Sequence, residues 1–405
     1  MITRTRYLDR MTPYLHTPVI KVITGMRRTG KSTMLQQLSD YCVSLGAKPA
    51  GILQINMESL EYANITDGAA LNDRVRKYFG SYKGQRYLFI DEVQEIPGWE
   101  KAVASLLAEK KTDITITGSN AHLLSSELAT LITGRYVTLP VYPLTFSEHC
   151  VFRGLKNPEK NPQRADEFTR YLRYGGLPGI HQFPDVQEII DEYLSSVMNS
   201  ILLRDVVMRS AVRDPAMLER VCRFVFDTVG SIITAKRIAD YAKSQRLKMT
   251  VDTAINYLRF LENAYLINRV PRYDIRGRRQ LELYDKYYMG DLGLRHGFLG
   301  YRDGDIGGLL ENVVHTELRA RGYSVAIGKS GEYEIDFVAQ RGEEKIYIQV
   351  AYLLAQEETV EREYRALESI PDSYPKYLLT MDPVRRTNRN GIVHQNLVDY
   401  LLAEP

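Results

Sequence analysis

The chain has 405 residues, more than one hydrophobic core usually serves, so we expect two or three domains. Hydrophobic residues make up 44% and charged residues 25%, as in ordinary soluble globular proteins. A net charge of +3 is too small to imply nucleic-acid binding by itself, so any basic surface must be local. No run of about 18 apolar residues is present, which argues against a membrane-spanning helix and against a membrane partner.

The three cysteines, Cys42, Cys150 and Cys222, lack the paired spacing of a disulfide framework or a zinc site. We interpret them as free, buried thiols in a reducing compartment. The first residues also lack the apolar segment of a signal peptide. Both observations predict a cytoplasmic protein.

A glycine-rich segment, Gly-Met-Arg-Arg-Thr-Gly-Lys-Ser-Thr, begins at Gly25. An apolar run precedes it and a helical pattern follows, so the context is strand, loop, helix. This context favours a phosphate-binding loop over an ordinary glycine turn, and it predicts ATP and Mg²⁺ as ligands. In such a loop the lysine contacts the phosphates and the following serine holds the metal. The predicted binding residues are Gly25, Arg28, Thr29, Gly30, Lys31, Ser32 and Thr33.

The apolar stretch 86–90 ends in two acids, Asp91 and Glu92. Parallel strands that are buried on both faces bind ligands at their carboxyl ends, so both acids are expected at the nucleotide site. We predict that Asp91 completes the Mg²⁺ shell and that Glu92 orients and deprotonates the attacking water. The alternative is a helix-capping role for this pair.

A further strand is predicted over residues 113–117, and Ser119 and Asn120 follow it. A polar side chain at this place can hydrogen-bond the γ-phosphate or the attacking water. Both residues are therefore candidate sensors of the nucleotide. The alternative for Asn120 is that it caps a helix over residues 121–128.

Together these segments resemble a bacterial and archaeal group of AAA-type ATPases that carry a C-terminal domain of unknown function. The similarity rests on residues 25–33, 88–92, 116–120, 133–135 and 142–148, and it continues through 174–178, 201–205, 288–293 and 333–338. The resemblance implies an α/β fold with a parallel P-loop NTPase sheet and a helical lid. It also implies an arginine that senses the γ-phosphate, within one subunit or from the neighbour in a homo-oligomeric ring. Arg135 fits that role by position, although it can equally pair with a carboxylate.

The middle of the chain has the pattern of a winged helix. Two helical repeats, 235–242 and 251–261, are joined by a turn, and strands over 264–268 and 281–284 flank an arginine-rich segment. The second helix offers too few basic groups for base readout, so the alternative is a packing module. The residues predicted to contact DNA phosphates are Arg272, Arg276, Arg278 and Arg279.

A helix over 309–320, strands over 333–339 and 345–352, and a last strand over 376–380 resemble the core of restriction-endonuclease-like nucleases. In that family, an acid on the first strand and an acid-x-lysine pattern on the second bind a divalent metal and activate water. Asp336 matches the first acid, whereas Gln349 replaces the second acid and Ala351 replaces the lysine. Glu311 is a further candidate, because it points toward the apolar side of its helix, where a simple surface acid is not expected. We predict a degenerate nuclease fold that is kept for binding DNA or a protein partner.

The expected domains are an AAA-type core (1–157), a helical lid (158–210), a winged helix (211–284) and a small α/β nuclease-like domain (285–405). The leading hypothesis is Mg²⁺-dependent ATP hydrolysis coupled to conformational change in a C-terminal region that binds DNA or a partner. One alternative is a slow nucleotide-gated switch that binds a protein. The other is a metal-dependent nuclease regulated by ATP.

Overall fold

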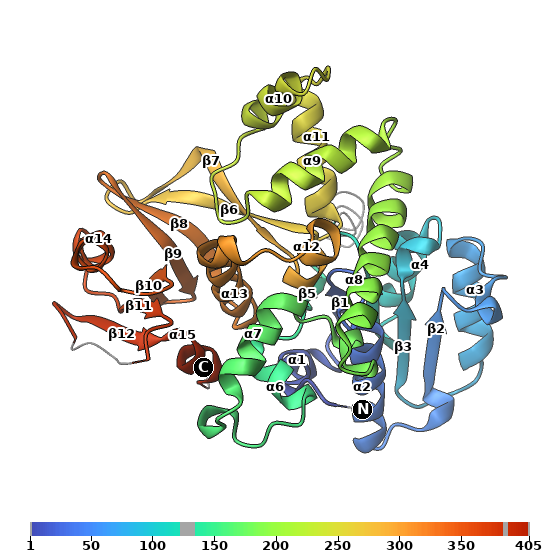
Figure 1. The fold of residues 1–405 in the computed structure, drawn as a ribbon. Coiled ribbons are helices and arrows are strands. Elements are labelled where there is room, and N and C mark those ends of the chain that lie inside the picture. The colour runs from blue at the N-terminus through green and yellow to red at the C-terminus, as the bar shows by residue number, and fades with distance from the viewer. Residues whose placement is uncertain (1, 122–133, 384–387, 404–405) are drawn as a thin grey trace. The chain divides into compact units, whose positions relative to one another are not determined.

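The computed structural model describes residues 2–121, 134–383 and 388–403. The chain folds into two compact units (Figure 1). Unit 1 comprises Met1–Val141 and Asn263–Tyr265, and unit 2 comprises Tyr142–Glu262 and Leu266–Pro405. The predicted nucleotide-binding segments up to residue 120 all belong to unit 1, and the predicted winged-helix and nuclease-like residues belong to unit 2.

Unit 1 is built on a five-stranded parallel sheet with the order β2-β3-β4-β1-β5. Its strands are β1 (Ile20–Thr24), β2 (Ile52–Asn56), β3 (Arg86–Asp91), β4 (Thr112–Gly118) and β5 (Tyr136–Pro140). Its helices are α1 (Thr5–Met11), α2 (Lys31–Ser44), α3 (Gly68–Phe79) and α4 (Trp99–Ala108). Because β3, β4 and β1 are neighbours, the loops at their carboxyl ends meet at one edge of the sheet.

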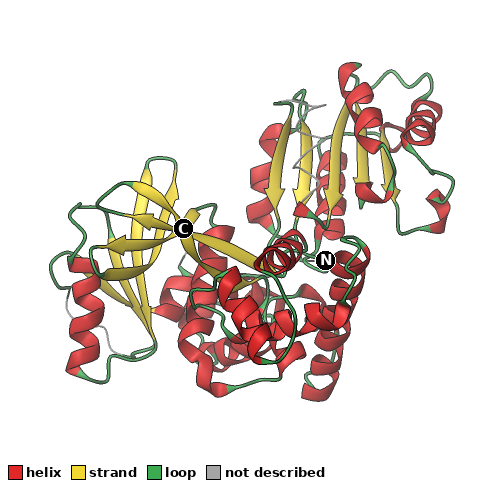
Figure 2. Ribbon diagram, turned by 90° about the horizontal axis from the view of Figure 1, so that it is seen from above, coloured by secondary structure: helices red, strands yellow, loops and turns green. Residues whose placement is uncertain are grey.

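Alternate residues of the central strands pack on opposite faces of this sheet. Leu88 and Ile90 of β3 join the apolar cluster that includes α3 and α4. Tyr87 and Phe89 join the cluster formed with α1 and α2. Figure 2 shows the sheet between its two layers of helices. A strand buried on both faces explains the continuous apolar run before Asp91.

Unit 2 contains a seven-stranded mixed sheet with the order β12-β11-β10-β9-β8-β6-β7. Its strands are β6 (Ile267–Asp274), β7 (Arg279–Met289), β8 (Ser324–Ser330), β9 (Tyr333–Arg341), β10 (Glu344–Ala351), β11 (Lys376–Thr380) and β12 (Ile392–Asn396). Its helices are α6 (Phe146–Phe152), α7 (Arg164–Tyr174), α8 (Gln187–Ile201), α9 (Pro215–Asp227), α10 (Ala235–Ser244), α11 (Val251–Asn263), α12 (Leu292–Leu299), α13 (Ile306–Ala320), α14 (Glu357–Glu368) and α15 (Leu397–Leu402). A π-helix, Leu202–Met208, continues α8.

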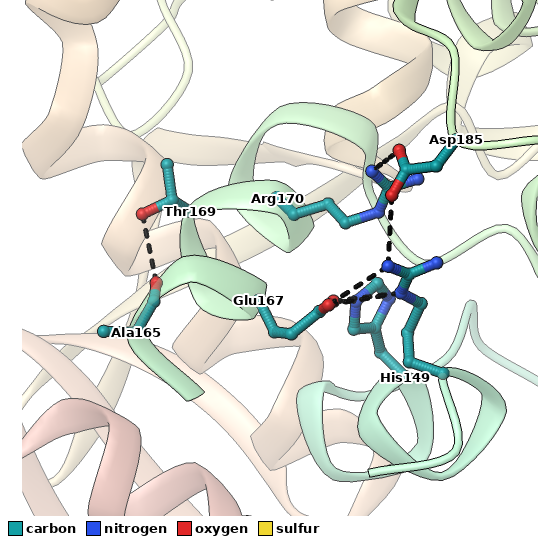
Figure 3. A network of polar contacts seen from close by, with 7 residues as sticks. His149, Ala165, Glu167, Thr169, Arg170 and Asp185 are labelled. Atoms are coloured by element: carbon teal, nitrogen blue, oxygen red, sulfur yellow. Dashed lines mark hydrogen bonds and ion pairs between the residues drawn. The ribbon is translucent and has the colours of Figure 1, made fainter. Parts of the chain in front are cut away.

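A polar network joins the first helices of unit 2 (Figure 3). Glu167 of α7 accepts a hydrogen bond from Arg153 Nε at 3.2 Å and lies 3.2 Å from His149 Nε2 of α6. Arg153 also pairs with Asp185 at 3.1 Å, and Arg170 pairs with the same carboxylate. Burial lowers the pKa of His149, although its contact with Glu167 opposes that shift. The network fixes α6 and α7 to the segment that precedes α8.

The two helices predicted between residues 235 and 261 are present as α10 and α11, but the predicted strands after them are wrong in their bounds. β6 and β7 are longer, and they include most of the arginine-rich segment that was expected to be a loop. β6 also pairs with β8, so this hairpin belongs to the same sheet as the C-terminal segment. β7 runs through the boundary expected between residues 284 and 285. The four-part division of the chain stays a prediction.

Sequence analysis missed three strands, β5, β8 and β12. β8 and β12 mix apolar residues with glycine, lysine, histidine or amides, which weakens the alternating pattern, and β5 is short and ends in proline. The three cysteines are free and buried, as predicted, whereas the reducing compartment stays a prediction. In the described part of the chain, no helix combines the length and the apolar character that a membrane crossing needs.

Candidate nucleotide site

The glycine-rich segment forms a loop between β1 and α2, as predicted. Gly25 has φ +147°, and a Cβ atom there would lie 2.2 Å from the carbonyl oxygen of Val141. Gly30 has φ +95° and directly precedes Lys31, the first residue of α2. Both positions therefore need glycine. The loop ends at a helix N-terminus, where free N–H groups and the helix dipole attract anions.

Lys31 and Glu92 meet at this loop. The Lys31 ammonium lies 3.6 Å from Glu92 Oε1 and donates a hydrogen bond to the carbonyl oxygen of Met26 at 3.1 Å. The side chains of Lys31 and Glu92 are 4% and 9% exposed, so the contact is largely shielded from water. The loop and the carboxyl end of β3 thus form one polar centre.

Thr117, at the end of β4, holds both acids of the predicted pair. Its hydroxyl donates to Asp91 Oδ1 at 2.5 Å and accepts the backbone N–H of Glu92 at 3.0 Å. Glu92 has φ +53°, a left-handed conformation that costs about 1–3 kcal/mol for a residue with a side chain. Strained backbone of this kind is concentrated at functional sites. Thr117 therefore stabilises the left-handed backbone of Glu92, which the sequence does not predict.

The carboxylate of Glu92 has two further donors. Ser119 Oγ donates to Glu92 Oε2 at 3.0 Å, and the Gln94 amide donates to the same oxygen. Burial acts to raise the pKa of Glu92, but the Lys31 ammonium and these hydrogen bonds outweigh it, and the pKa lies below the usual value. Glu92 is therefore ionised at neutral pH and can accept a proton.

Arg4 supports the loop from outside the predicted motif. Its Nη1 donates to the carbonyl oxygen of Thr29 at 3.2 Å, and its guanidinium stacks over the Tyr7 ring with Cζ 4.4 Å from the centroid. Arg4 is 6% exposed, whereas the sequence favoured a solvated surface position for it over a place near the nucleotide. Only the repeated arginines of the first ten residues could have drawn attention to it.

The other predicted residues of unit 1 lie in different surroundings. Ser32 and Thr33 occupy the exposed first turn of α2, and the Arg28 side chain is exposed in the loop. Asn120 is half-buried at the end of β4, and the helix that it was expected to cap lies, apart from Ala121, outside the described residues. Their roles stay predictions.

Arg135 does not lie at the phosphate loop of its own chain. Its side chain is exposed, and its carbonyl oxygen accepts the N–H of Ile20 at 2.9 Å, where β1 begins. The loop follows the other end of β1, four residues and roughly 13 Å further along the strand. This position does not favour a sensor role within one subunit. A role across a ring interface stays a prediction.

In unit 2 the structure brings Glu311 and Asp336 together through Lys286, which lies 3.3 Å and 3.8 Å from their carboxylates. The Gln349 amide nitrogen donates instead to Glu363 of α14 at 2.9 Å. Sequence analysis missed Lys286, because its partners are far away along the chain.

The four candidate DNA-contacting arginines divide into two groups. Arg276, Arg278 and Arg279 are exposed around the turn between β6 and β7. Arg272 is partly buried, with its guanidinium 3.9 Å from Glu334. Only the first group is open to a phosphate backbone without breaking an ion pair.

Comparison with known proteins agrees with the architecture of unit 1. A family described as an AAA domain matches residues 17–150, and a domain of unknown function matches residues 165–305. An uncharacterised protein of Haemophilus influenzae is 38% identical over 403 residues, which cover 99% of each chain. The chain belongs to this AAA-domain family. The predicted resemblance to proteins with an AAA domain and a C-terminal domain of unknown function is thereby confirmed.

One further relative by sequence and one solved structure are similar to this chain. An uncharacterised protein of Methanocaldococcus jannaschii is 32% identical over 360 residues, covering 86% of this chain and 78% of that protein. The solved structure of a Walker-type ATPase of Pyrococcus abyssi is similar with a TM-score of 0.51 and 16% identity, over 74% of this chain and 96% of that one. The P-loop NTPase fold predicted for the core is confirmed. Membership in the family supports ATP binding by this AAA-domain protein.

Proposed function

We propose that this chain binds ATP with Mg²⁺ at the β1–α2 loop and hydrolyses it with Glu92 as the base. The observation that carries the proposal is the meeting of Lys31 and Glu92, 3.6 Å apart, at the N-terminus of α2. A phosphate-binding cation and an ionised carboxylate beside one loop are the two groups that nucleotide hydrolysis needs.

The donors and acceptors at this loop fit ATP and Mg²⁺. The N–H groups at the start of α2 and the Lys31 ammonium suit phosphate oxygens, and the Ser32 hydroxyl and the Asp91 carboxylate are oxygen ligands that Mg²⁺ prefers. When bound, Mg²⁺ would neutralise charge on the phosphates. Lys31 would then contact the phosphates instead of Glu92, so the Glu92 carboxylate could contact a water molecule.

Glu92 is suited to orient and deprotonate a water molecule. Thr117 fixes its backbone, Ser119 and Gln94 hold one carboxylate oxygen, and the other oxygen faces Lys31. A carboxylate held by hydrogen bonds loses little conformational freedom when it accepts a proton. Ser119 thus contributes to the site by positioning Glu92, and Asn120 is left as the candidate nucleotide sensor.

The second part of the proposal is that hydrolysis changes the conformation of a region of unit 2 that binds DNA. The exposed arginines of the β6–β7 turn, Arg276, Arg278 and Arg279, support a contact with a phosphate backbone. A protein partner is the competing occupant. The ring, the slow switch and the ATP-regulated nuclease stay predictions that no contact described above favours.

Nucleotide binding by Lys31→Ala protein tests the first part of the proposal. We expect purified wild-type protein to bind ATP in the presence of Mg²⁺, measured by calorimetry, and Lys31→Ala to lose that binding, because the phosphates lose their cation. Lys48→Ala removes an exposed lysine of unit 1 and serves as the matched control. Wild-type affinity in the Lys31→Ala protein would contradict the assignment of the loop.

A further inference from the structure

The Lys286 ammonium lies among three carboxylates inside unit 2. It is 2.9 Å from Glu334 Oε1, 3.3 Å from Glu311 Oε2 and 3.8 Å from Asp336 Oδ1. The four side chains come from β7, β9 and α13, and that of Lys286 is 5% exposed. We call these four residues the Lys286 cluster. It coincides with two of the three positions predicted for a degenerate nuclease site.

The carboxylates of the cluster also have partners besides Lys286. Tyr288 O–H donates to Glu311 Oε2 at 2.8 Å, and the backbone N–H of Val350 donates to Asp336 Oδ2 at 2.8 Å. Arg272 adds a second positive charge 3.9 Å from Glu334 Oε2. Two cations therefore face three acids, so most of the negative charge that would attract a metal is compensated within the chain.

Gln349 is also unsuited to bind a metal, because both polar groups of its side chain are hydrogen-bonded within the protein. Its Oε1 accepts the backbone N–H of Asp336 at 3.2 Å, while its amide nitrogen donates to Glu363 at 2.9 Å. The residue that replaces the expected acid thus joins β10 to β9 and α14. Across the described residues, no group of three or more His, Cys, Asp and Glu side chains is arranged to hold a metal ion.

The charges of the cluster keep the Lys286 side chain protonated. Burial acts to lower the pKa of Lys286, but Glu311, Asp336 and Glu334 outweigh it, and the pKa lies above the usual value. Burial and the charge of Glu311 raise the pKa of Asp336 well above its usual range. A divalent ion would need about six oxygen ligands at 2.0–2.6 Å and would have to displace this ammonium.

We propose that Lys286 is the resident cation of this acidic cluster, that it fastens β7 to α13 and β9, and that the cluster for this reason takes no divalent metal. The ammonium lies within 3.8 Å of Glu311 and Asp336, two of the residues predicted for a degenerate nuclease site. The cluster is then a structural joint between the β6–β7 hairpin and the nuclease-like part of unit 2. This inference is independent of ATP hydrolysis in unit 1.

Titration with Mn²⁺ tests the proposal. We expect wild-type protein to show no Mn²⁺ binding that depends on this cluster, when free Mn²⁺ is followed by electron paramagnetic resonance. Lys286→Met keeps most of the side-chain length but removes the charge, so it should have a lower Tm, bind Mn²⁺ and recover part of its Tm when Mn²⁺ is added. Lys345→Met is the matched control, since Lys345 faces one carboxylate, Asp372, at 3.7 Å.

Two results would overturn the proposal. The first is Mn²⁺ binding by wild-type protein that Asp336→Asn abolishes, because such binding would place a metal in the cluster rather than at Asp91. The second is a folded Lys286→Met protein that binds no more Mn²⁺ than the Lys345→Met control. If Lys286→Met does not fold, Lys286→Arg keeps the charge and should fold without binding Mn²⁺, and the Asp336→Asn comparison still decides.

Discussion

At the scale of single residues, the candidate nucleotide site depends on side chains outside the phosphate loop and the acidic pair. Thr117, Ser119 and Gln94 position the two acids, and Arg4 holds the carbonyl oxygen of Thr29. These groups lie outside the phosphate loop, but they fix its shape and the orientation of Glu92. Loss of one of them should change how well the site binds and turns over nucleotide without removing a reacting group.

Arg4→Ala should weaken ATP binding more than turnover. A buried hydrogen bond from a charged donor contributes about 1.5–3 kcal/mol, so we expect KM for ATP to rise about tenfold while kcat changes less. Steady-state ATPase kinetics measure this split. Arg10→Ala removes another arginine from the same N-terminal segment and should leave KM unchanged. Equal KM values for Arg4→Ala and wild type would show that the loop does not need this support.

At the scale of elements, the arginine-rich hairpin joins two parts of the chain that the sequence suggested were separate. β6 pairs with β8, and Lys286 of β7 reaches the acids of α13 and β9. The hairpin therefore presents its arginines from a sheet that extends to β12. A rigid base of this kind suits a surface that contacts an extended partner.

Replacing Arg276, Arg278 and Arg279 together with alanine should weaken DNA binding and make it less dependent on salt. Each phosphate contact contributes about 0.9 to the slope of log K against log salt concentration, so the slope should become shallower by up to about 3. Binding across a salt series, with and without ATP, measures this effect. The triple lysine variant keeps the charge and is the control. If wild-type protein shows no measurable DNA binding, the hairpin serves a protein partner instead.

The elements that hold the candidate nucleotide site could be predicted because their sequence signals are local. The glycine loop and the apolar run before Asp91 each occupy consecutive residues, and the structure has the expected elements at those places. β8 and β12 were not predicted, because polar residues and glycine interrupt the alternation of their apolar residues. The contacts of Lys286 with Glu311 and of Arg4 with Thr29 could not be predicted, since each joins residues that are 25 apart in the sequence.

Buried charge limited the predictions in the same way. The stretch that precedes the phosphate loop was interpreted as apolar, yet Lys21 within β1 is fully buried and pairs with Asp113 of β4. A charge can be buried in a core only when a partner compensates it, and that partner belongs to a different strand. Periodicity detects the burial of such a strand but cannot identify the pair.

At the scale of the whole molecule, we propose different roles for the two units. Unit 1 carries the groups for nucleotide chemistry, while the acidic cluster of unit 2 is compensated by Lys286 and Arg272. Hydrolysis of ATP is accordingly the reaction that we assign to this chain. The exposed hairpin arginines of unit 2 are the binding surface that we propose.

The ATPase rate of Glu92→Gln protein tests the central claim most directly. The amide keeps the size of the side chain but cannot accept the proton of water, and a general base contributes about 10²–10⁴-fold to a rate. We expect ATP to bind as in wild type while ADP formation falls by about 10²-fold or more. A Glu92→Gln protein that hydrolyses ATP at the wild-type rate would contradict the account.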